Sequence, residues 1–228
     1  MRPLLLGHRG ARASRHIPEN TLASFELCLQ HGCDGFEFDV RQSADGAAVI
    51  CHDPAIRGLE IESTPARALA LPSLEEVLQQ FSSRAFLDIE LKVVGLQTHL
   101  ITALRSNPPQ KGYVVSSFLP EVLGAVRNLD ASIPLGFLCE KSGVLSMASG
   151  ASCPARSEDE SIPFAFPVKW LIPRVDLVDP ELIERSHASG RKVTAWTVNA
   201  ADEMVQLTAW GVDAIISDQT EMLVQSFR

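Results

Sequence analysis

The chain has 228 residues, of which 46% are hydrophobic and 21% charged, and its formal net charge is -8. This composition is typical of a globular protein with one large core, and it excludes a largely disordered chain. The negative net charge argues against broad binding to nucleic acid or anionic lipid, because such binding needs Lys and Arg clustered on one face. An anionic ligand would therefore need a local concentration of positive charge.

The cysteines and the first residues indicate a cytoplasmic protein. Five cysteines form no CxxC pair and mostly lie in apolar runs: Cys28, Cys33, Cys51, Cys139 and Cys153. This pattern is typical of thiols in a reducing compartment. The apolar run near the N-terminus is too short for a signal peptide, and no stretch of 18 apolar residues is present, so stable membrane insertion is not expected.

Short apolar runs rich in Val, Ile, Leu and Phe recur along the chain and predict eight strands. They lie at residues 3–6, 34–40, 85–91, 113–116, 133–138, 168–172, 192–198 and 213–217. Segments with apolar residues at helical spacing separate most of them, around Phe25, Val77, Val126 and Met204. Two helix starts are predicted, one by the capping-box pair Ser73 and Glu76 and one by Asp179 before Pro180. Helix ends are predicted at Gly32, Gly190 and Gly211.

Alternating strands and helices predict a parallel sheet, and eight strands fit a (β/α)8 TIM barrel that forms a single domain over residues 1–228. A doubly wound open sheet is the alternative. It would usually need fewer strands, and no Gly-x-Gly-x-x-Gly follows the first run. Ser, Gly, Pro and acidic residues interrupt the pattern over residues 141–167, so we expect the fifth helix to be short or replaced by a loop.

Acidic side chains alternate with apolar ones in two of the predicted strands. Glu37 and Asp39 are two residues apart, and Asp88, Glu90 and Lys92 repeat the spacing in the next strand. The period of a strand places each set on one face. The apolar face meets the helices, so we expect the charged face to point into the barrel near its carboxyl rim, where barrel active sites are built.

Converging carboxylates predict a cation site. At an effective dielectric constant near 20, two carboxylates about 4 Å apart repel each other by roughly 4 kcal/mol. Glu37, Asp39 and Glu90 therefore need compensation, and their hard oxygen atoms suit the divalent cations Mg2+ or Ca2+. The alternative is a structural cluster of salt bridges that uses Lys92 and Arg41.

Two histidines follow predicted strands. His8 comes after the first, and His52 comes after a short strand at 48–51 that an Asp45-Gly46 turn joins to the second. Near a metal-bound phosphodiester, one imidazole could take a proton from the nucleophile and the other could protonate the leaving alkoxide. Arg9 offers a planar guanidinium that suits phosphate oxygens. Taken alone, a histidine in such a position is more often a structural residue that is hydrogen-bonded at the rim.

These motifs together resemble the glycerophosphodiester phosphodiesterases. The resemblance runs in order through His8-Arg9-Gly10-Ala11, Pro18-Glu19-Asn20-Thr21, Glu37-Phe38-Asp39-Val40, Asp45-Gly46, His52-Asp53, Glu90-Leu91-Lys92 and Trp196-Thr197-Val198-Asn199. No single piece is specific, but the ordered set is. It implies a (β/α)8 barrel that uses a divalent cation to cleave a small-molecule glycerophosphodiester into glycerol 3-phosphate and an alcohol.

The resemblance also implies roles for individual residues. Glu37, Asp39 and Glu90 match the family's metal ligands, and His8 and His52 match its acid–base pair. Arg9 and Lys92 match its phosphate contacts, and Glu19 matches an accessory acid near the metal. Phe118 and Trp196 match aromatic residues that line its substrate pocket. An aromatic residue that only packs the top of the barrel is the alternative role for Trp196.

Two departures from the family pattern bear on the substrate. The loop at 11–17 is longer than usual and basic, so it is either a solvated loop or a grip for a second anionic group. The segment between His52-Asp53 and residue 71 is shorter than the segment that the family usually inserts there to help recognise the substrate. The resemblance therefore does not identify the alcohol that is released, and lysophospholipids are among the candidate substrates.

Two further function classes remain at this point. A relative that binds phosphodiesters without catalysis would have little reason to retain both histidines and all three acids. A sugar-phosphate isomerase or aldolase could use Lys92 as a base or as a Schiff-base nucleophile. Against that class, the chain lacks a Gly-rich phosphate loop near its last strands, where only Ser217-Asp218 follows.

Overall fold

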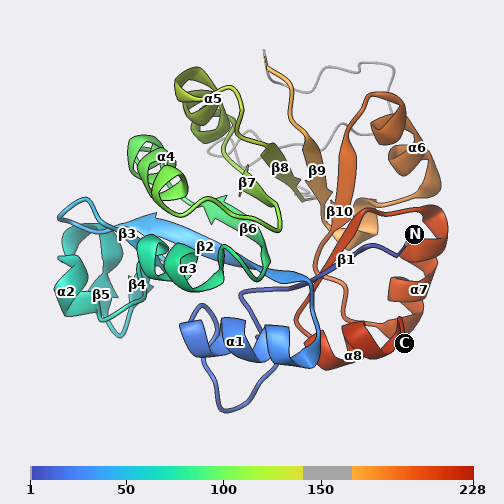
Figure 1. The fold of residues 1–228 in the computed structure, drawn as a ribbon, viewed down its shortest axis with the longest axis horizontal. Coiled ribbons are helices and arrows are strands. Elements are labelled where there is room, and N and C mark those ends of the chain that lie inside the picture. The colour runs from blue at the N-terminus through green and yellow to red at the C-terminus, as the bar shows by residue number, and fades with distance from the viewer. Residues whose placement is uncertain (1, 141–165) are drawn as a thin grey trace.

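A closed barrel of parallel strands forms the centre of the structure, a computed structural model that describes residues 2–140 and 166–228 (Figure 1). Its eight strands within those residues are β1 (Leu4–Gly7), β2 (Gly35–Gln42), β6 (Phe86–Leu91), β7 (Tyr113–Ser117), β8 (Leu135–Cys139), β9 (Trp170–Pro173), β10 (Lys192–Ala195) and β11 (Ala214–Ser217). They pair in chain order, and β1 pairs with both β11 and β2. This closure confirms the predicted barrel and makes the open-sheet alternative wrong.

Helices alternate with the strands around the barrel (Figure 1). They are α1 (Leu22–His31), α3 (Leu74–Phe81), α4 (Gln97–Ser106), α5 (Pro120–Leu129), α6 (Pro180–Ala188), α7 (Ala201–Trp210) and α8 (Thr220–Gln225), with a 3-10 turn η2 (Val175–Leu177) before α6. Ser73 and Glu76 form the predicted capping box at α3, and the Asp179 carboxylate accepts from the Leu182 amide at the start of α6. Local capping chemistry thus sets these helix boundaries.

The outward face of β2 explains why its acids point inward. Phe36 and Phe38 are fully buried on that face. Phe36 stacks on Phe25 of α1 with ring centroids 4.3 Å apart and meets the edge of Phe81 of α3 at 5.2 Å. Such aromatic pairs are favourable beyond the area they bury, so they fix the orientation of the strand. The alternating acidic residues of β2 consequently lie on the barrel side.

Strand β2 continues beyond the barrel and carries an antiparallel partner, β3 (Ala48–Ile50). The turn between them has the Gly46 amide bonded to the Ser43 carbonyl, with Gly46 at φ 81°, as the Asp45-Gly46 motif predicts. After β3 come β4 (Ala55–Ile56), β5 (Leu59–Glu60), the 3-10 turn η1 (Ile61–Ser63) and α2 (Ala66–Leu69). The chain returns beside its departure point, where the Ile50 amide donates to the Pro72 carbonyl at 2.9 Å.

Some strand limits differ from those predicted. The run at 192–198 ends as a strand at Ala195, and Trp196 adds only an isolated parallel bridge to Arg174, in which its carbonyl accepts from the Val175 amide. The interruption predicted at 141–167 lies almost wholly outside the described residues, as does Cys153. Cys28, Cys33 and Cys51 are buried thiols. No helix in the described part of the chain is long and apolar enough to span a membrane.

Candidate functional site

Three buried carboxylates meet inside the barrel near the carboxyl ends of β2 and β6. The two strands pair in parallel, with Asp39 opposite Glu90 and Glu37 opposite Asp88. Ligand oxygens of Glu37, Asp39 and Glu90 all lie within 4.8 Å of one another. Their residues are only 4%, 1% and 6% exposed, respectively. The strand register therefore brings together the three acids that the sequence singled out.

The hydrogen bonds of Glu37 and Asp39 leave carboxylate oxygens without donors. The Glu37 Oε2 atom accepts from the Arg9 amide at 2.9 Å, whereas its Oε1 atom is buried without a hydrogen bond. Asp39 Oδ2 accepts from Asn20 Nδ2 at 2.7 Å, and Asn20 Oδ1 accepts in turn from the Asp39 amide. Buried polar atoms are rarely left unpaired. Hard oxygen donors in this state fit a divalent cation.

The protonation behaviour of these acids reflects their crowding. Burial, followed by the charges of Asp39 and Glu90, raises the pKa of Glu37 well above its ordinary value. Burial also raises the pKa of Glu90 to about 7, against the lowering effect of Lys92. For Asp39, burial acts upward, but Lys92 and Arg9 outweigh it and lower the pKa. Glu37 is thus the acid with the least compensation, because no Lys or Arg side chain pairs with it in the described structure.

Lys92 is the main cation beside the acids. Its Nζ atom lies 2.6 Å from Glu90 Oε1 and 3.0 Å from Asp39 Oδ1. Arg41, the other cation of the structural salt-bridge alternative, does not join the cluster, since its Nε donates to the His52 carbonyl at 2.8 Å. The salt-bridge alternative is therefore right that Lys92 pairs with the acids and wrong that Arg41 does.

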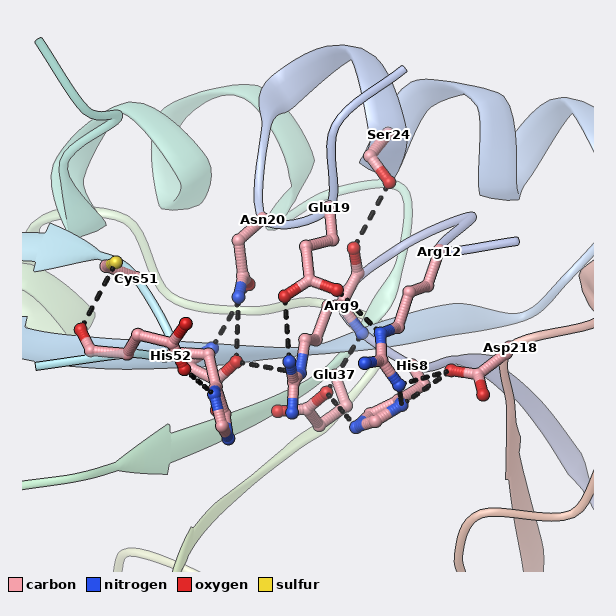
Figure 2. Close-up of polar contacts among 12 residues, drawn as sticks. His8, Arg9, Arg12, Glu19, Asn20, Ser24, Glu37, Cys51, His52 and Asp218 are labelled. Atoms are coloured by element: carbon pink, nitrogen blue, oxygen red, sulfur yellow. Dashed lines mark hydrogen bonds and ion pairs between the residues drawn. The ribbon is translucent and has the colours of Figure 1, made fainter. Parts of the chain in front are cut away.

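Arg9 is the second cation of the site, and Glu19 holds it. Arg9 Nη1 lies 2.7 Å from Glu19 Oε1, and its Nε lies 3.3 Å from Asp39 Oδ2. The other Glu19 oxygen accepts from Arg12 Nε at 2.6 Å. Glu19 lies in a salt-bridge network beside the three acids rather than among them (Figure 2). Arg12 of the basic 11–17 loop is engaged by carboxylates, which argues against a freely solvated loop at this residue.

The two predicted histidines both lie at this rim and each contacts an aspartate. His8 follows β1, and its Nδ1 lies 2.7 Å from Asp218 Oδ1 while its Nε2 lies 3.9 Å from Glu37 Oε2. His52 follows β3, with its Nδ1 2.7 Å from Asp53 Oδ1. Burial, and next the charge of Lys92, lowers the pKa of His52. In Figure 2, Arg9 and Glu37 lie between the two imidazoles.

Two aromatic rings form an apolar wall beside Lys92. Phe118 and Trp196 meet edge to face with centroids 5.5 Å apart, and Lys92 Nζ lies 5.8 Å from the Phe118 centroid. The indole of Trp196 donates to the Ile172 carbonyl at 2.9 Å. Both rings are partly buried against the apolar interior of the barrel. The structure thus places both predicted aromatic residues together, next to a cation of the site.

Four polar residues at this rim had no assigned role in the sequence reasoning. Asn20 holds Asp39, while Arg12, Asn199 and Asp218 are linked to His8. Asn20 and Asn199 stand inside motifs that carried the resemblance, and Asp218 directly follows a predicted strand. For Asn199 and Asp218, the available clue was therefore a polar residue directly after a predicted strand. Asp88, on the acidic face of β6, accepts instead from the Ser116 hydroxyl.

Known proteins resemble this chain over nearly its whole length. A glycerophosphodiester phosphodiesterase of Caldanaerobacter subterraneus subsp. tengcongensis is 28% identical over an alignment of 256 residues that covers 100% of this chain and 99% of the relative. A phosphodiesterase structure from Oleispira antarctica, in complex with the product sn-glycerol-3-phosphate, has a TM-score of 0.78 at 25% identity and covers 99% and 96% of the two chains.

A glycerophosphodiester phosphodiesterase structure from Thermotoga maritima shares the fold, with a TM-score of 0.79 at 21% identity over 99% of this chain and 98% of that one. The model of the Glycerophosphoryl diester phosphodiesterase family matches residues 8–102 and 96–222. These two segments contain all three acids and both histidines of the site. With this match over most of its length, the chain belongs to the glycerophosphoryl diester phosphodiesterase family.

Proposed function

We propose that this protein hydrolyses glycerophosphodiesters to glycerol 3-phosphate and an alcohol, with a divalent cation and two histidines. The observation that carries the proposal is the set of three buried carboxylates within 4.8 Å, two of which, Glu37 and Asp39, keep an oxygen without a hydrogen bond. Family membership supports the reaction class, and the product complex of the Oleispira antarctica enzyme supports glycerol 3-phosphate as the product.

In this proposal Glu37, Asp39 and Glu90 hold Mg2+ or Ca2+, both of which prefer carboxylate oxygens. The bound cation would supply Lewis-acid polarisation of the phosphoryl oxygen and offset the developing negative charge. The donor set fits this role because it offers only oxygen atoms and includes the unpaired Glu37 Oε1.

Arg9 and Lys92 balance the charge of the substrate. Three carboxylates and one divalent cation leave one net negative charge, and a phosphodiester adds another. Two cationic side chains bring this assembly close to neutral, so the site accepts an anion without a large electrostatic penalty. Both cations already lie beside the acids, at 3.3 Å for Arg9 Nε and 3.0 Å for Lys92 Nζ from Asp39.

His8 and His52 would divide the two proton transfers. Hydrolysis of an alkyl diester requires that the attacking hydroxyl lose a proton and that the leaving alkoxide gain one, and each imidazole has its Nδ1 engaged by an aspartate. The Nε2 atoms then remain for the substrate. Either assignment of acid and base fits this geometry. The wall of Phe118 and Trp196 would contact the apolar part of the substrate, because it adjoins Lys92.

The cellular setting follows as a further part of the proposal. The expected partner is a small glycerophosphodiester rather than nucleic acid, in keeping with the net charge of -8. Buried thiols at Cys28, Cys33 and Cys51 support a reducing compartment, which we take to be the cytoplasm.

A substrate panel tests the proposal directly. Purified protein would be assayed for release of glycerol 3-phosphate from glycerophosphocholine, glycerophosphoethanolamine and glycerophosphoglycerol, and for release of lysophosphatidic acid from a lysophospholipid. Each assay would be run with EDTA, with Mg2+ and with Ca2+. We expect turnover of at least one diester, its loss in EDTA and its recovery with added metal. Full turnover by metal-stripped protein would contradict the metal site, and absence of glycerol 3-phosphate from every diester would contradict the function.

A further inference from the structure

The His8 ring is held from the side opposite the acidic cluster. Gly7 of β1 is in register with Ser217 of β11, so the residues that follow, His8 and Asp218, lie side by side where the barrel closes. The His8 amide donates to the Ser217 carbonyl at 2.9 Å, and His8 Nδ1 lies 2.7 Å from Asp218 Oδ1. Side-chain exposures of 11% and 18% for His8 and Asp218 mean that water competes little for this contact.

Asp218 is itself fixed by Asn199 and Arg12. Asn199 Nδ2 donates to Asp218 Oδ2 at 2.8 Å, while Asn199 Oδ1 accepts from the Asp218 amide and from the Ser217 hydroxyl. Arg12 Nη1 donates to Asp218 Oδ1 at 3.2 Å. Burial by itself raises the pKa of Asp218, but the hydrogen bond from His8 and those from its other donors hold it far below its ordinary value. Asp218 is therefore a carboxylate that only accepts hydrogen bonds.

This arrangement settles which nitrogen of His8 carries the proton. Because Asp218 only accepts, the 2.7 Å contact requires a proton on His8 Nδ1. Arg12 Nη1 lies 3.5 Å from the same nitrogen, and with Nδ1 protonated it cannot donate to it. Arg12 and His8 then both donate to Asp218 Oδ1. In the neutral ring the lone pair resides on Nε2, the nitrogen that faces Glu37.

We propose that Asp218 is a positioning residue that acts through His8, holding its ring plane and its Nδ1–H tautomer so that Nε2 is presented to the reacting phosphodiester. The inference rests on the proposed function, in which His8 transfers a proton. Asp218 would not touch the substrate, and its effect would be on turnover rather than on binding of metal or diester.

The substitution Asp218→Asn tests this role with little change of shape. If the new amide nitrogen takes the Oδ2 position, it meets Asn199 Nδ2, which cannot turn away because Asn199 Oδ1 already serves two donors. If it takes the Oδ1 position, it points N–H groups at Arg12 and at His8 Nδ1. The second orientation removes the acceptor for His8 Nδ1–H, whereas the first keeps an oxygen there that is uncharged and no longer fixed by Asn199. In either case the hold on the Nδ1–H tautomer is weakened.

The same strand offers a matched control at its other end. Asp213 precedes β11, and its carboxylate accepts from His187 Nε2 at 2.8 Å and from the Val193 amide at 2.9 Å. Asp213→Asn disturbs an aspartate–histidine pair of similar geometry at the amino rim of the barrel. It should leave kcat and KM at the parent values.

The kinetic experiment uses the metal-loaded protein and an alkyl glycerophosphodiester. Asp218→Asn should lower kcat by at least about tenfold and by no more than the loss of about 10^2 to 10^4 expected when an acid–base group is removed, and it should leave KM within about twofold. In the His8→Ala background, Asp218→Asn should have no further effect, because the residue through which it acts is gone. A purely structural role would instead give additive losses and a lower melting temperature.

Nitrogen NMR of the His8 ring gives a readout that needs no activity. At a pH where the ring is neutral, the parent should show a protonated Nδ1 and an unprotonated Nε2, and Asp218→Asn should show a smaller population of this tautomer. A parent ring protonated at Nε2 overturns the inference, even if the variant fails to fold.

The two arms separate the inference from the proposed function. Full turnover by Asp218→Asn, with His8→Ala impaired, overturns the positioning role and leaves the proposed function standing. A parent protein that cleaves no diester defeats the proposed function, and the NMR arm then decides alone whether Asp218 fixes the His8 tautomer.

Discussion

Replacing Glu37 by glutamine should stabilise the metal-free protein and at the same time remove its stabilisation by metal. Glu37 is the acid of the cluster that no Lys or Arg side chain in the described structure pairs with, and its Oε1 atom has no hydrogen bond. Glutamine keeps the shape, and its carbonyl oxygen can still accept from the Arg9 amide. It removes the negative charge that crowds Asp39 and Glu90.

The size of the effect follows from the distances. Two unit charges 4.8 Å apart repel by about 3.5 kcal/mol at an effective dielectric constant near 20. The new amide N–H group offsets part of this stabilisation if it has no hydrogen-bond acceptor, because an unpaired buried donor costs about 1–3 kcal/mol. We expect a net gain of about 1–2 kcal/mol, which raises Tm by about 2–8 °C for a chain of this size. At a hundredfold excess of metal over Kd the parent gains about 2.7 kcal/mol by linkage, and the variant should gain almost none.

The assay is thermal unfolding of both proteins in EDTA and in a titration of Mg2+ or Ca2+. The variant should have the higher Tm in EDTA, and the parent should have the higher Tm with excess metal. The pKa of Glu37 is raised in the folded protein, so Glu37 does not destabilise the fold below its ordinary pKa and lowers the free energy of unfolding increasingly as pH rises. The advantage of the variant in EDTA should therefore vanish near pH 4. A variant less stable than the parent in EDTA at pH 7, or one with an unchanged metal response, would refute the reasoning.

Asp88→Asn is the matched control for this experiment. Asp88 lies opposite Glu37 in the sheet, is equally buried, and also has an oxygen without a hydrogen bond, but it does not belong to the group of three. Burial raises its pKa to about 7. Asp88→Asn should therefore keep the full metal-induced shift in Tm, which separates loss of a ligand from relief of a buried charge.

Three other outcomes are expected. His8→Ala and His52→Ala should each lower kcat on an alkyl diester by at least about a hundredfold, with metal affinity by calorimetry unchanged; on a diester with an activated phenol, only the variant that lacks the acid should recover. Although burial acts to raise the pKa of Glu19, Arg9 and Arg12 lower it, so Glu19 stabilises the fold above its ordinary pKa and this contribution is lost as pH falls through the lowered value. Glu19→Gln should accordingly lower Tm at pH 7 and leave it unchanged near pH 2. Ser73→Ala removes the cap of α3 and should cost about 1 kcal/mol, or about 2–4 °C in Tm by calorimetry, without affecting turnover.

The barrel and its acids were predictable because they depend on local patterns. Alternation in β2 and β6 places apolar residues toward the helices and carboxylates toward the interior, and this holds whatever the remote parts of the chain do. The capping box at Ser73 and the turn at Asp45-Gly46 likewise depend on neighbouring residues alone.

The misplacement of Arg41 has a geometric cause. By strand period it shares a face with Glu37 and Asp39, but β2 extends past the barrel rim at this point and pairs with β3, so the Arg41 side chain meets the His52 carbonyl instead. Period alone carries no information about where a strand leaves the barrel.

The support of His8 was not predictable, because it depends on closure of the barrel. Asp218 is 210 positions from His8 along the chain and meets it only because β1 and β11 pair. Arg12 adds to this network through a loop whose course no short-range pattern specifies. In the sequence, Ser217-Asp218 indicates only that no Gly-rich phosphate loop follows the last predicted strand.

The return of the chain beside β3 has a consequence for how the family can diversify. Residues 51–71 leave and rejoin the fold at adjacent points, where the Cys51 amide donates to the Asp39 carbonyl and the Ile50 amide to the Pro72 carbonyl. Since the cost of closing a loop grows only slowly, at about 0.6 kcal/mol for each doubling of length, a longer segment can replace this excursion if it keeps apolar side chains where Ile61 and Leu69 pack against Val49. His52, anchored by Arg41, sits before the exchangeable part. A library of grafts between residues 54 and 71 would thus test whether this excursion sets the alcohol specificity while the three acids and both histidines stay in place.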